Sequence, residues 1–354
     1  MRRRHAMSRM AASMLPVCLI FCVASSSARK SGPDLQTVSP EEVGWSSQKL
    51  AEAAQYAGEL GFSAFMLVHD GKIMFSWGDV ERNYNCHSIR KPFLSALYGI
   101  YVDNKTIDLS HTMEELGIDD IEPKLTATEK QATIRQLLQA RSGVYHESAS
   151  EAESMKAARP ERGSHQPGEF FYYNNWDFNA LGTIFRQLTG KDIFQEFKAR
   201  IADPIGMQDF DVANCRYDYE REKSEHPNYG FRMSARDMAR FGVLYQKGGV
   251  WEGKRILPEN WMSESTATYS VTDSTLGAGF GYMWGTILEG SRMAKLLGGA
   301  GIFFSGIGVH SLAVIPELKL VLVLRMDTDG DWTPPAPGTG GKLYSMITGA
   351  RMTE

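Results

Sequence analysis

Apolar residues follow two different spacings along the chain, one typical of strands and the other typical of helices. Near the N-terminus, two apolar runs at residues 62–68 and 72–77 flank the turn signal His69-Asp-Gly71, which predicts a β-hairpin. Near the other end, residues 303–316 have β character and residues 320–326 form a strong strand pattern. The sequence therefore predicts strands at both ends of the chain.

Between these ends the apolar residues recur with helical spacing. Helices are expected from about residue 39 to 60, after Ser88, over residues 133–139, after Asp177 and over residues 233–246. This order predicts an α/β fold of the α+β kind, in which one central antiparallel sheet is formed from N- and C-terminal strands and flanked by helices. The sheet region is expected at about 38–85 and 295–354, with a mostly helical region inserted at about 86–294. The charged and aromatic residues 216–228 are interpreted as a solvated loop.

The first 28 residues have the pattern of a secretory signal peptide. Arg2-Arg3-Arg4 gives a basic start, residues 10–24 are mostly apolar but short for a membrane span, and residues 25–28 are small. Residues 29–354 are then expected to form a single catalytic domain that is periplasmic or secreted. An uncleaved N-terminal anchor is the alternative, and no other stretch is long enough to span a membrane.

Composition and charge narrow the class of protein. The 354 residues are 43% apolar and 23% charged with a net charge of -4, and they contain no basic stripe, so a nucleic-acid partner is not expected. Beyond the signal segment only Cys86 and Cys215 remain, and an exported chain could pair them, although the sequence does not show that they meet. No cluster has metal-ligand spacing, so no metal or other cofactor is expected. The oligomeric state is left open.

Ser88 and Lys91 stand three residues apart at the start of a predicted helix, so they share one face. A serine hydroxyl needs a base that takes its proton, and a lysine can be that base if burial or positive charge lowers its pKa. The first helical turn also favours developing negative charge. The alternative is a chance pair, a serine near a helix start followed by a solvated lysine.

Further motifs follow in order along the chain. Ile134-Arg-Gln-Leu-Leu138 precedes Ser142-Gly143, Tyr173-Asn-Asn175 follows Pro167-Gly168, and a helical motif runs from Ser234 to Gly242. Together with Ser88-Ile-Arg-Lys91 they resemble the serine β-lactamase and penicillin-binding-protein superfamily, from about Val43 to Val323. The branch that it most resembles contains class C β-lactamases, DD-peptidases, esterases and 6-aminohexanoate-oligomer hydrolases. The resemblance implies a β-lactamase/transpeptidase-like fold.

The resemblance also implies catalytic roles. Ser88 would be the acylated nucleophile, and Lys91 would accept its proton or hold that hydrogen bond. Tyr173 would act as general base and later as general acid, if neighbouring positive charge lowers its pKa. Asn175 would orient Lys91 and a substrate amide. Without the resemblance, Tyr173 is one more core aromatic residue.

The third motif departs from the superfamily. Relatives usually carry Lys-Thr-Gly or His-Thr-Gly ten residues before a proline turn, whereas this chain has Phe304-Ser305-Gly306 ten residues before Pro316. Phe304 can neither bind a substrate carboxylate nor lower the pKa of the tyrosine. The backbone N–H groups of Ser88 and Ile307 can still form an oxyanion hole, because a backbone donor does not depend on its side chain.

Two more residues are candidates for the substrate pocket, beside the three of the third motif. Trp284 resembles an aromatic position that lines the pocket in relatives, and its alternative is a core tryptophan. His310 either reaches the site or is a satisfied strand histidine, and the second reading is favoured. The expected function is an exported serine hydrolase that cleaves a small-molecule amide or ester through an acyl-enzyme on Ser88. The alternatives are β-lactamase or DD-peptidase activity, or a non-catalytic binding protein on the same fold.

Overall fold

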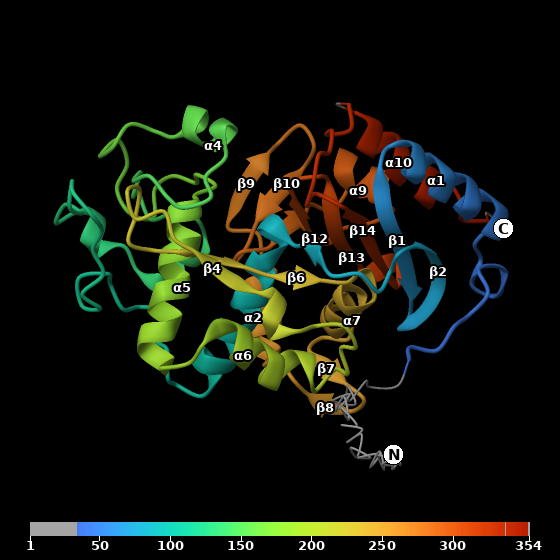
Figure 1. Cartoon of the computed structure of the whole chain (residues 1–354), viewed down its shortest axis with the longest axis horizontal. Helices are drawn as coiled ribbons and strands as arrows, with labels where there is room; N and C mark the ends of the chain where they lie inside the picture. Colours follow the sequence, from blue (N-terminus) through green and yellow to red (C-terminus); the bar gives the residue numbers. More distant parts are fainter. Residues whose placement is uncertain (1–33, 337, 353–354) are drawn as a thin grey trace, which may run out of the picture. The chain divides into compact units, whose positions relative to one another are not determined.

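The structure, a computed structural model, describes residues 34–336 and 338–352, so the predicted signal peptide lies outside the described residues. The described residues belong to one compact unit. Within the described part of the chain its centre is an eight-stranded antiparallel sheet (Figure 1). From one edge to the other, its strands are β2 (Lys72–Gly78), β1 (Phe62–His69), β14 (Leu320–Met326), β13 (His310–Ile315), β12 (Gly301–Gly306), β11 (Gly285–Ile287), β10 (Ala278–Phe280) and β9 (Ser270–Asp273).

Strands from the two ends of the chain pair with each other in one sheet, as the sequence predicts. β1 pairs with β2 in the expected hairpin and with β14 on its other side, where Phe65 faces Leu324 and Leu67 faces Leu322. The central antiparallel sheet is therefore confirmed. The sheet also contains β9, β10 and β11, which come from the stretch expected to be mostly helical. They were not predicted because each is only three or four residues long, and β10 and β11 contain a glycine.

Both faces of the sheet are covered, which explains why β14 is apolar at nearly every position. Leu320, Leu322 and Leu324 pack on one side against α1 (Ser47–Glu59), α9 (Arg292–Leu297) and α10 (Thr339–Thr348). Figure 1 shows α1 and α10 next to each other on that side. Val321 and Val323 pack into the core on the opposite side. The active-site helices lie on this second side.

The other α-helices of the described chain are α2 (Arg90–Asp103), α3 (Ile134–Leu138), α4 (Glu153–Ala158), α5 (Asn175–Thr189), α6 (Ile193–Phe197), α7 (Ala235–Gln246) and α8 (Glu259–Ser265). The sequence predicted α2, α3, α5 and α7, whereas α4, α6 and α8 were not predicted. The side chain of Ser234 accepts a hydrogen bond from the Asp237 N–H and so caps α7. α7 lies directly on the sheet, because a Cβ at Gly242 would be only 2.4 Å from the Val321 side chain. The stretch at residues 39–60 is split, so that a short 3-10 turn precedes α1.

Short elements complete the chain. The 3-10 turns are η1 (Glu41–Val43), η2 (His87–Ile89), η3 (Glu129–Gln131), η5 (Val212–Asn214) and η6 (Pro316–Leu318), and η4 (Lys198–Ala202) is a π-helix. Three small ribbons pair β3 (Tyr84–Asn85) with β6 (Arg232–Met233), β4 (Arg216–Asp218) with β5 (Asn228–Gly230), and β7 (Val250–Trp251) with β8 (Lys254–Arg255). The interpretation of residues 216–228 as a solvated loop is wrong, because both of its ends form the β4–β5 ribbon. In the described ranges, no helix is long and apolar enough to cross a membrane.

Candidate active site

Ser88 lies in the short turn η2, immediately before α2. The preceding residue His87 has a φ of +44°, which is uncommon for a residue other than glycine. Its N–H donates to the Asn85 side-chain oxygen at 3.1 Å, and its Nε2 lies 2.8 Å from the Thr328 hydroxyl. These contacts hold a sharp turn that places Ser88 at the N-terminal end of α2.

Arg325 fixes the strand that leads into this turn. It is fully buried in β14, and its Nη2 donates to the carbonyls of Tyr84 at 2.9 Å, Asn85 at 3.1 Å and Met233 at 3.3 Å. The sequence interpretation missed this residue. The available signal was a single arginine inside an otherwise apolar strand.

Lys91 is a buried base candidate in direct contact with the nucleophile. Its Nζ donates to Ser88 Oγ at 3.0 Å, and the side chain is packed against the rings of Tyr173 and Phe178, each 4.9 Å from Nζ. Burial, assisted by the charge of Arg90, holds the pKa of Lys91 well below its ordinary value. The alternative of a solvated lysine is wrong, because the residue is only 1% exposed. A neutral amine at this place can accept the Ser88 proton.

Tyr173 lies beside Ser88 and Lys91, but its pKa is shifted in the opposite direction from the one expected. Burial raises the pKa of its phenol above the ordinary value, and a hydrogen bond to Ser88 and the charge of Arg90 only partly oppose that effect. The condition on which the role of general base depended, a lowered pKa, is therefore not met. A protonated phenol next to Ser88 is instead suited to donate a proton.

Asn175 and Arg90 are buried polar residues close to the pair. Asn175 begins α5, and its Nδ2 donates to the Ser150 carbonyl at 2.7 Å. The Arg90 guanidinium is 3% exposed, donates from Nη2 to the Asn179 side chain at 3.0 Å and lies over the Tyr229 ring at 4.1 Å. Asn175 Oδ1 and Arg90 Nη1 have no hydrogen-bond partner within the described chain. The structure thus does not join Asn175 to Lys91 by a hydrogen bond.

The end of β12 lies against the nucleophile turn. A Cβ at Gly306 would be 3.0 Å from the Cys86 carbonyl oxygen and 3.3 Å from the Ser88 nitrogen, so only glycine allows this approach. Ile307, the next residue, is thereby carried to Ser88. Among the described residues, neither the Ser88 N–H nor the Ile307 N–H donates to a backbone carbonyl. Two free donors on adjoining segments are what an oxyanion hole requires.

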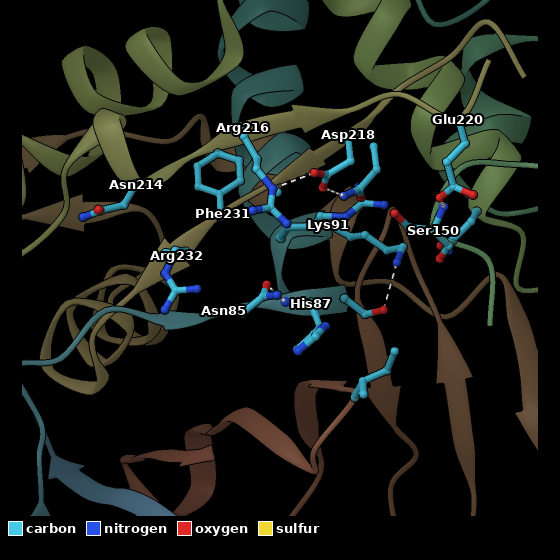
Figure 2. A pocket seen from close by; sticks show the side chains of 16 residues that line it. Asn85, His87, Lys91, Ser150, Asn214, Arg216, Asp218, Glu220, Phe231 and Arg232 are labelled. Carbon is cyan, nitrogen blue, oxygen red and sulfur yellow. Dashed lines mark hydrogen bonds and ion pairs between the residues drawn. The ribbon is translucent and has the colours of Figure 1, made fainter. Parts of the chain in front are cut away.

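Two cavities meet at Ser88 and Ile307. The first, here called the polar cavity, has a volume of about 430 Å³ and is lined by Asn85, His87, Ser88, Arg90, Lys91, Ser150, Asn175, Asn214, Arg216, Asp218, Glu220, Asn228, Gly230, Phe231, Arg232 and Ile307 (Figure 2). The second, the apolar cavity, has a volume of about 350 Å³ and is lined by Ser88, Phe171, Tyr173, Thr272, Gly279, Phe280, Gly285, Phe303, Phe304, Ser305, Gly306 and Ile307. Ser88 therefore lies between the polar cavity and the apolar cavity and lines both.

The remaining predicted pocket residues divide into two groups. Phe304, Ser305 and Gly306 line the apolar cavity. Trp284 is fully buried against Tyr245, with ring centroids 4.7 Å apart, and lines neither cavity, so the expectation of a pocket position is wrong. His310 also lines neither cavity.

His310 is a buried strand histidine that packs behind the nucleophile turn. Its Nδ1 accepts the Met326 N–H at 3.2 Å, and its ring lies 5.5 Å from the His87 ring. Burial lowers the pKa of His310, so the ring is neutral. The alternative in which His310 reaches the site is therefore wrong, and the favoured reading as a strand histidine agrees with the structure.

The described residues contain neither a disulfide nor a group of side chains placed to bind a metal. Cys86 is buried and Cys215 is partly buried, and both are free thiols. No group of three or more histidine, cysteine, aspartate or glutamate side chains among the described residues is placed to hold a metal ion.

Comparisons with known proteins agree with this architecture. The sequence model of the family described as Beta-lactamase matches residues 50–336. No curated protein matches the chain in sequence. A solved structure named as a 6-aminohexanoate-dimer hydrolase from Bacillus anthracis is similar with a TM-score of 0.67 and 20% identity, over 90% of this chain and 87% of that chain.

Two further solved structures show the same fold. D-alanine carboxypeptidase AmpC from Burkholderia cenocepacia is similar with a TM-score of 0.61 and 15% identity, over 86% of this chain and 99% of that chain. EstCE1, described as a hydrolase with promiscuous acyltransferase activity, gives a TM-score of 0.58 and 15% identity, over 86% of this chain and 98% of that chain. At these identities the likeness concerns the fold.

Proposed function

The chain belongs to the Beta-lactamase family, and on that premise we propose that it is a serine hydrolase that cleaves an amide or ester through an acyl-enzyme on Ser88. The observation that carries the proposal is the 3.0 Å hydrogen bond between Ser88 Oγ and the buried amine of Lys91. A serine with a neutral, desolvated amine beside it is an activated nucleophile. The free N–H groups of Ser88 and Ile307 then supply the site for the negative oxygen.

In the acylation step, Ser88 Oγ forms a bond to the substrate carbonyl carbon while its proton passes to Lys91 Nζ. The tetrahedral oxygen is held by the two backbone N–H groups. When the bond to the leaving oxygen or nitrogen breaks, Tyr173 donates its phenolic proton to that atom, and the proton on Lys91 restores the phenol. In the second step, water attacks the Ser88 ester and releases the acid, and Ser88 regains its proton.

A second candidate function, β-lactamase or DD-peptidase activity, would use the same serine. Phe304 argues against it, because this residue is 5% exposed in an apolar cavity and offers no cation for a carboxylate on the substrate. Burying that carboxylate without a partner costs free energy that neutral esters and amides avoid. We therefore expect p-nitrophenyl esters to be turned over faster than a chromogenic cephalosporin, and the reverse order would refute this reading of Phe304.

The experiment that tests the enzyme proposal is labelling with a fluorophosphonate probe followed by mass spectrometry. The adduct is expected on Ser88 and is expected to vanish in Ser88→Ala. Ser305→Ala is the matched control, because Ser305 also lines the apolar cavity, whereas the hydrogen bond to Lys91 is formed by Ser88. If the probe leaves Ser88 unmodified in the folded protein, the chain is a non-catalytic binding protein on this fold.

We also propose that the protein is exported, on the basic start and the apolar stretch that follows it in residues 1–28. Expression of the full chain in a Gram-negative host is expected to give a shortened protein in the periplasm. N-terminal sequencing of that protein would identify the cleavage point. Recovery of the uncleaved chain in the membrane fraction would favour the anchor instead.

A further inference from the structure

The two cavities that share Ser88 differ sharply in chemistry. Apart from the shared residues, the apolar cavity is lined by four phenylalanines, Tyr173, Thr272, Ser305 and glycines, without a charged side chain among the described lining residues. The polar cavity carries charged and amide side chains, among them Asn85, Arg216, Asp218, Glu220 and Arg232, which Figure 2 labels. A substrate whose scissile carbonyl lies at Ser88 must place one half in each cavity.

The position of Tyr173 decides which half goes where. Tyr173 lines the apolar cavity and not the polar one, whereas Lys91 lines the polar cavity. A group that donates a proton to the leaving atom must lie within hydrogen-bond reach of that atom. The leaving group therefore occupies the apolar cavity. An ionic leaving group would lose its hydration there without gaining a partner.

The acyl half then occupies the polar cavity, where most charges are already paired. Arg216 is paired with Asp218 at 2.6 Å, Arg232 with Asp329, and Glu220 with Lys223. Arg90 forms no ion pair within the described chain, which leaves it as the uncompensated cation of this cavity.

Arg90 Nη1 and Asn175 Oδ1 are buried polar atoms without partners among the described residues. The orientation of the Asn175 amide is set by its hydrogen bond to the Ser150 carbonyl, so the free atom is the acceptor oxygen. Both atoms have almost no accessible surface, so it is the Arg90 cation lining the cavity, rather than these two atoms, that an acyl group with a hydrogen-bond acceptor would meet.

We propose that the substrates are esters or amides that join a polar acyl group, bearing a hydrogen-bond acceptor such as an amide carbonyl or a carboxylate, to an uncharged apolar alcohol or amine. This inference rests on the proposed function, because it places the scissile carbonyl at Ser88. It names a substrate polarity that follows from the two cavity linings and from the side on which the proton donor lies.

The first test uses the wild-type protein and four esters. They combine N-acetylglycine or hexanoic acid with 3-phenylpropanol or 2-(2-methoxyethoxy)ethanol, and each kcat/KM is divided by the hydroxide-catalysed rate of the same ester. The N-acetylglycine ester of 3-phenylpropanol is expected to be the best substrate, by about tenfold or more over the hexanoate of methoxyethoxyethanol. Succinate in place of N-acetylglycine distinguishes a carboxylate acceptor from an amide acceptor.

The second test uses two neighbouring phenylalanines. Phe171 lines the apolar cavity and packs on Phe280 with ring centroids 5.2 Å apart, whereas Phe170 is 43% exposed and stacks on His165 outside it. Phe171→Ala is expected to lower kcat/KM about tenfold for phenylpropyl esters and to leave methoxyethoxyethyl esters nearly unchanged. Phe170→Ala is expected to change neither.

The outcomes separate the two proposals. If Ser88 forms the fluorophosphonate adduct but the hexanoate of methoxyethoxyethanol is the best ester, the assignment of the cavities is reversed and the inference is wrong. Equal rates for all four esters, or equal losses in both phenylalanine variants, would also overturn it while leaving the serine hydrolase intact. If neither the adduct nor hydrolysis is observed, the proposed function falls and the inference falls with it.

Discussion

Replacing Gly306 by alanine is expected to damage catalysis while leaving the fold intact. Gly306 ends β12 and lies against the nucleophile turn, so its added methyl group would lie 3.0 Å from the Cys86 carbonyl oxygen, 3.1 Å from His87 Cβ and 3.3 Å from the Ser88 nitrogen. The residue does not adopt a positive φ, so the alanine backbone itself is unstrained. The whole effect of the substitution therefore comes from the contact with the Ser88 turn.

The size of the effect follows from these distances. Carbon atoms pack favourably at about 3.5–4.0 Å, so β12 and the turn must separate by roughly half an ångström. Overpacking of this kind destabilises proteins by about 1–3 kcal/mol, which a domain of this size tolerates. Loss of one oxyanion donor costs about 100- to 1000-fold in kcat, so a partial displacement of the Ile307 N–H from the Ser88 N–H should cost roughly 10- to 100-fold.

The assay compares Gly306→Ala with wild type in kcat/KM for a p-nitrophenyl ester and in the rate of fluorophosphonate labelling. Gly330→Ala is the matched control, because no atom lies within 4 Å of its added Cβ. Thermal unfolding of both variants is measured to check that each is folded. Unchanged kcat/KM in a folded Gly306→Ala protein would refute the placement of the oxyanion hole between Ser88 and Ile307.

Three other predictions follow from buried charges and phenols. Lys91→Met is expected to abolish ester hydrolysis and to stabilise the fold, because the folded state depresses the pKa of Lys91 and the unfolded state binds the proton. Denaturant unfolding measures the difference in free energy of unfolding between Lys91→Met and wild type. This difference should grow by about 1.4 kcal/mol per pH unit as the pH falls below about 10 toward the lowered pKa of Lys91. A variant less stable than wild type would contradict this. In the pH–rate profile of the wild type, kcat/KM should fall on the acid side as Lys91 becomes protonated, and it should show no loss near pH 8 from Tyr173, because burial raises the pKa of that phenol. Arg325→Met should lower the free energy of unfolding by about 2–4 kcal/mol and slow labelling of Ser88, since the Tyr84 and Asn85 carbonyls lose their donor, whereas labelling at the wild-type rate would show that the turn holds its shape without it.

β1 and β14 were predictable because their sequences are long and almost entirely apolar. Residues 62–68 and 320–326 each carry a β pattern, and they pair with each other in the structure. β9, β10 and β11 were missed, since strands of three or four residues have no measurable period. β11 pairs with β12, β10 with β11, and β9 with β10, so pairing with neighbouring strands rather than local preference makes them strands.

The site was only partly predictable, because burial is a property of the fold and not of the motif. Ser88, Lys91 and Tyr173 come together as the resemblance implies. Spacing alone left open whether Lys91 was solvated. The role of general base that the resemblance implies for Tyr173 required a lowered pKa, whereas burial in the folded protein raises it. Trp284 was misassigned for the same reason, since an aromatic residue in a motif looks alike whether it lines a cavity or fills the core.

Because Phe304 stands where relatives carry a basic residue, the charge that develops during acylation must be stabilised by other groups. With no cation on the apolar side, Lys91 and Tyr173 both rest in their neutral forms, so acylation must create charge in a site that excludes water. Arg90 is a buried cation that lines the polar cavity, and its charge lowers the pKa of both Lys91 and Tyr173. It opposes protonation of Lys91, so it cannot by itself stabilise the separated charges. The negative oxygen therefore depends on the two backbone donors more than it would in a site with a lysine in the third motif, and this dependence is why a single methyl group at Gly306 is expected to be so costly.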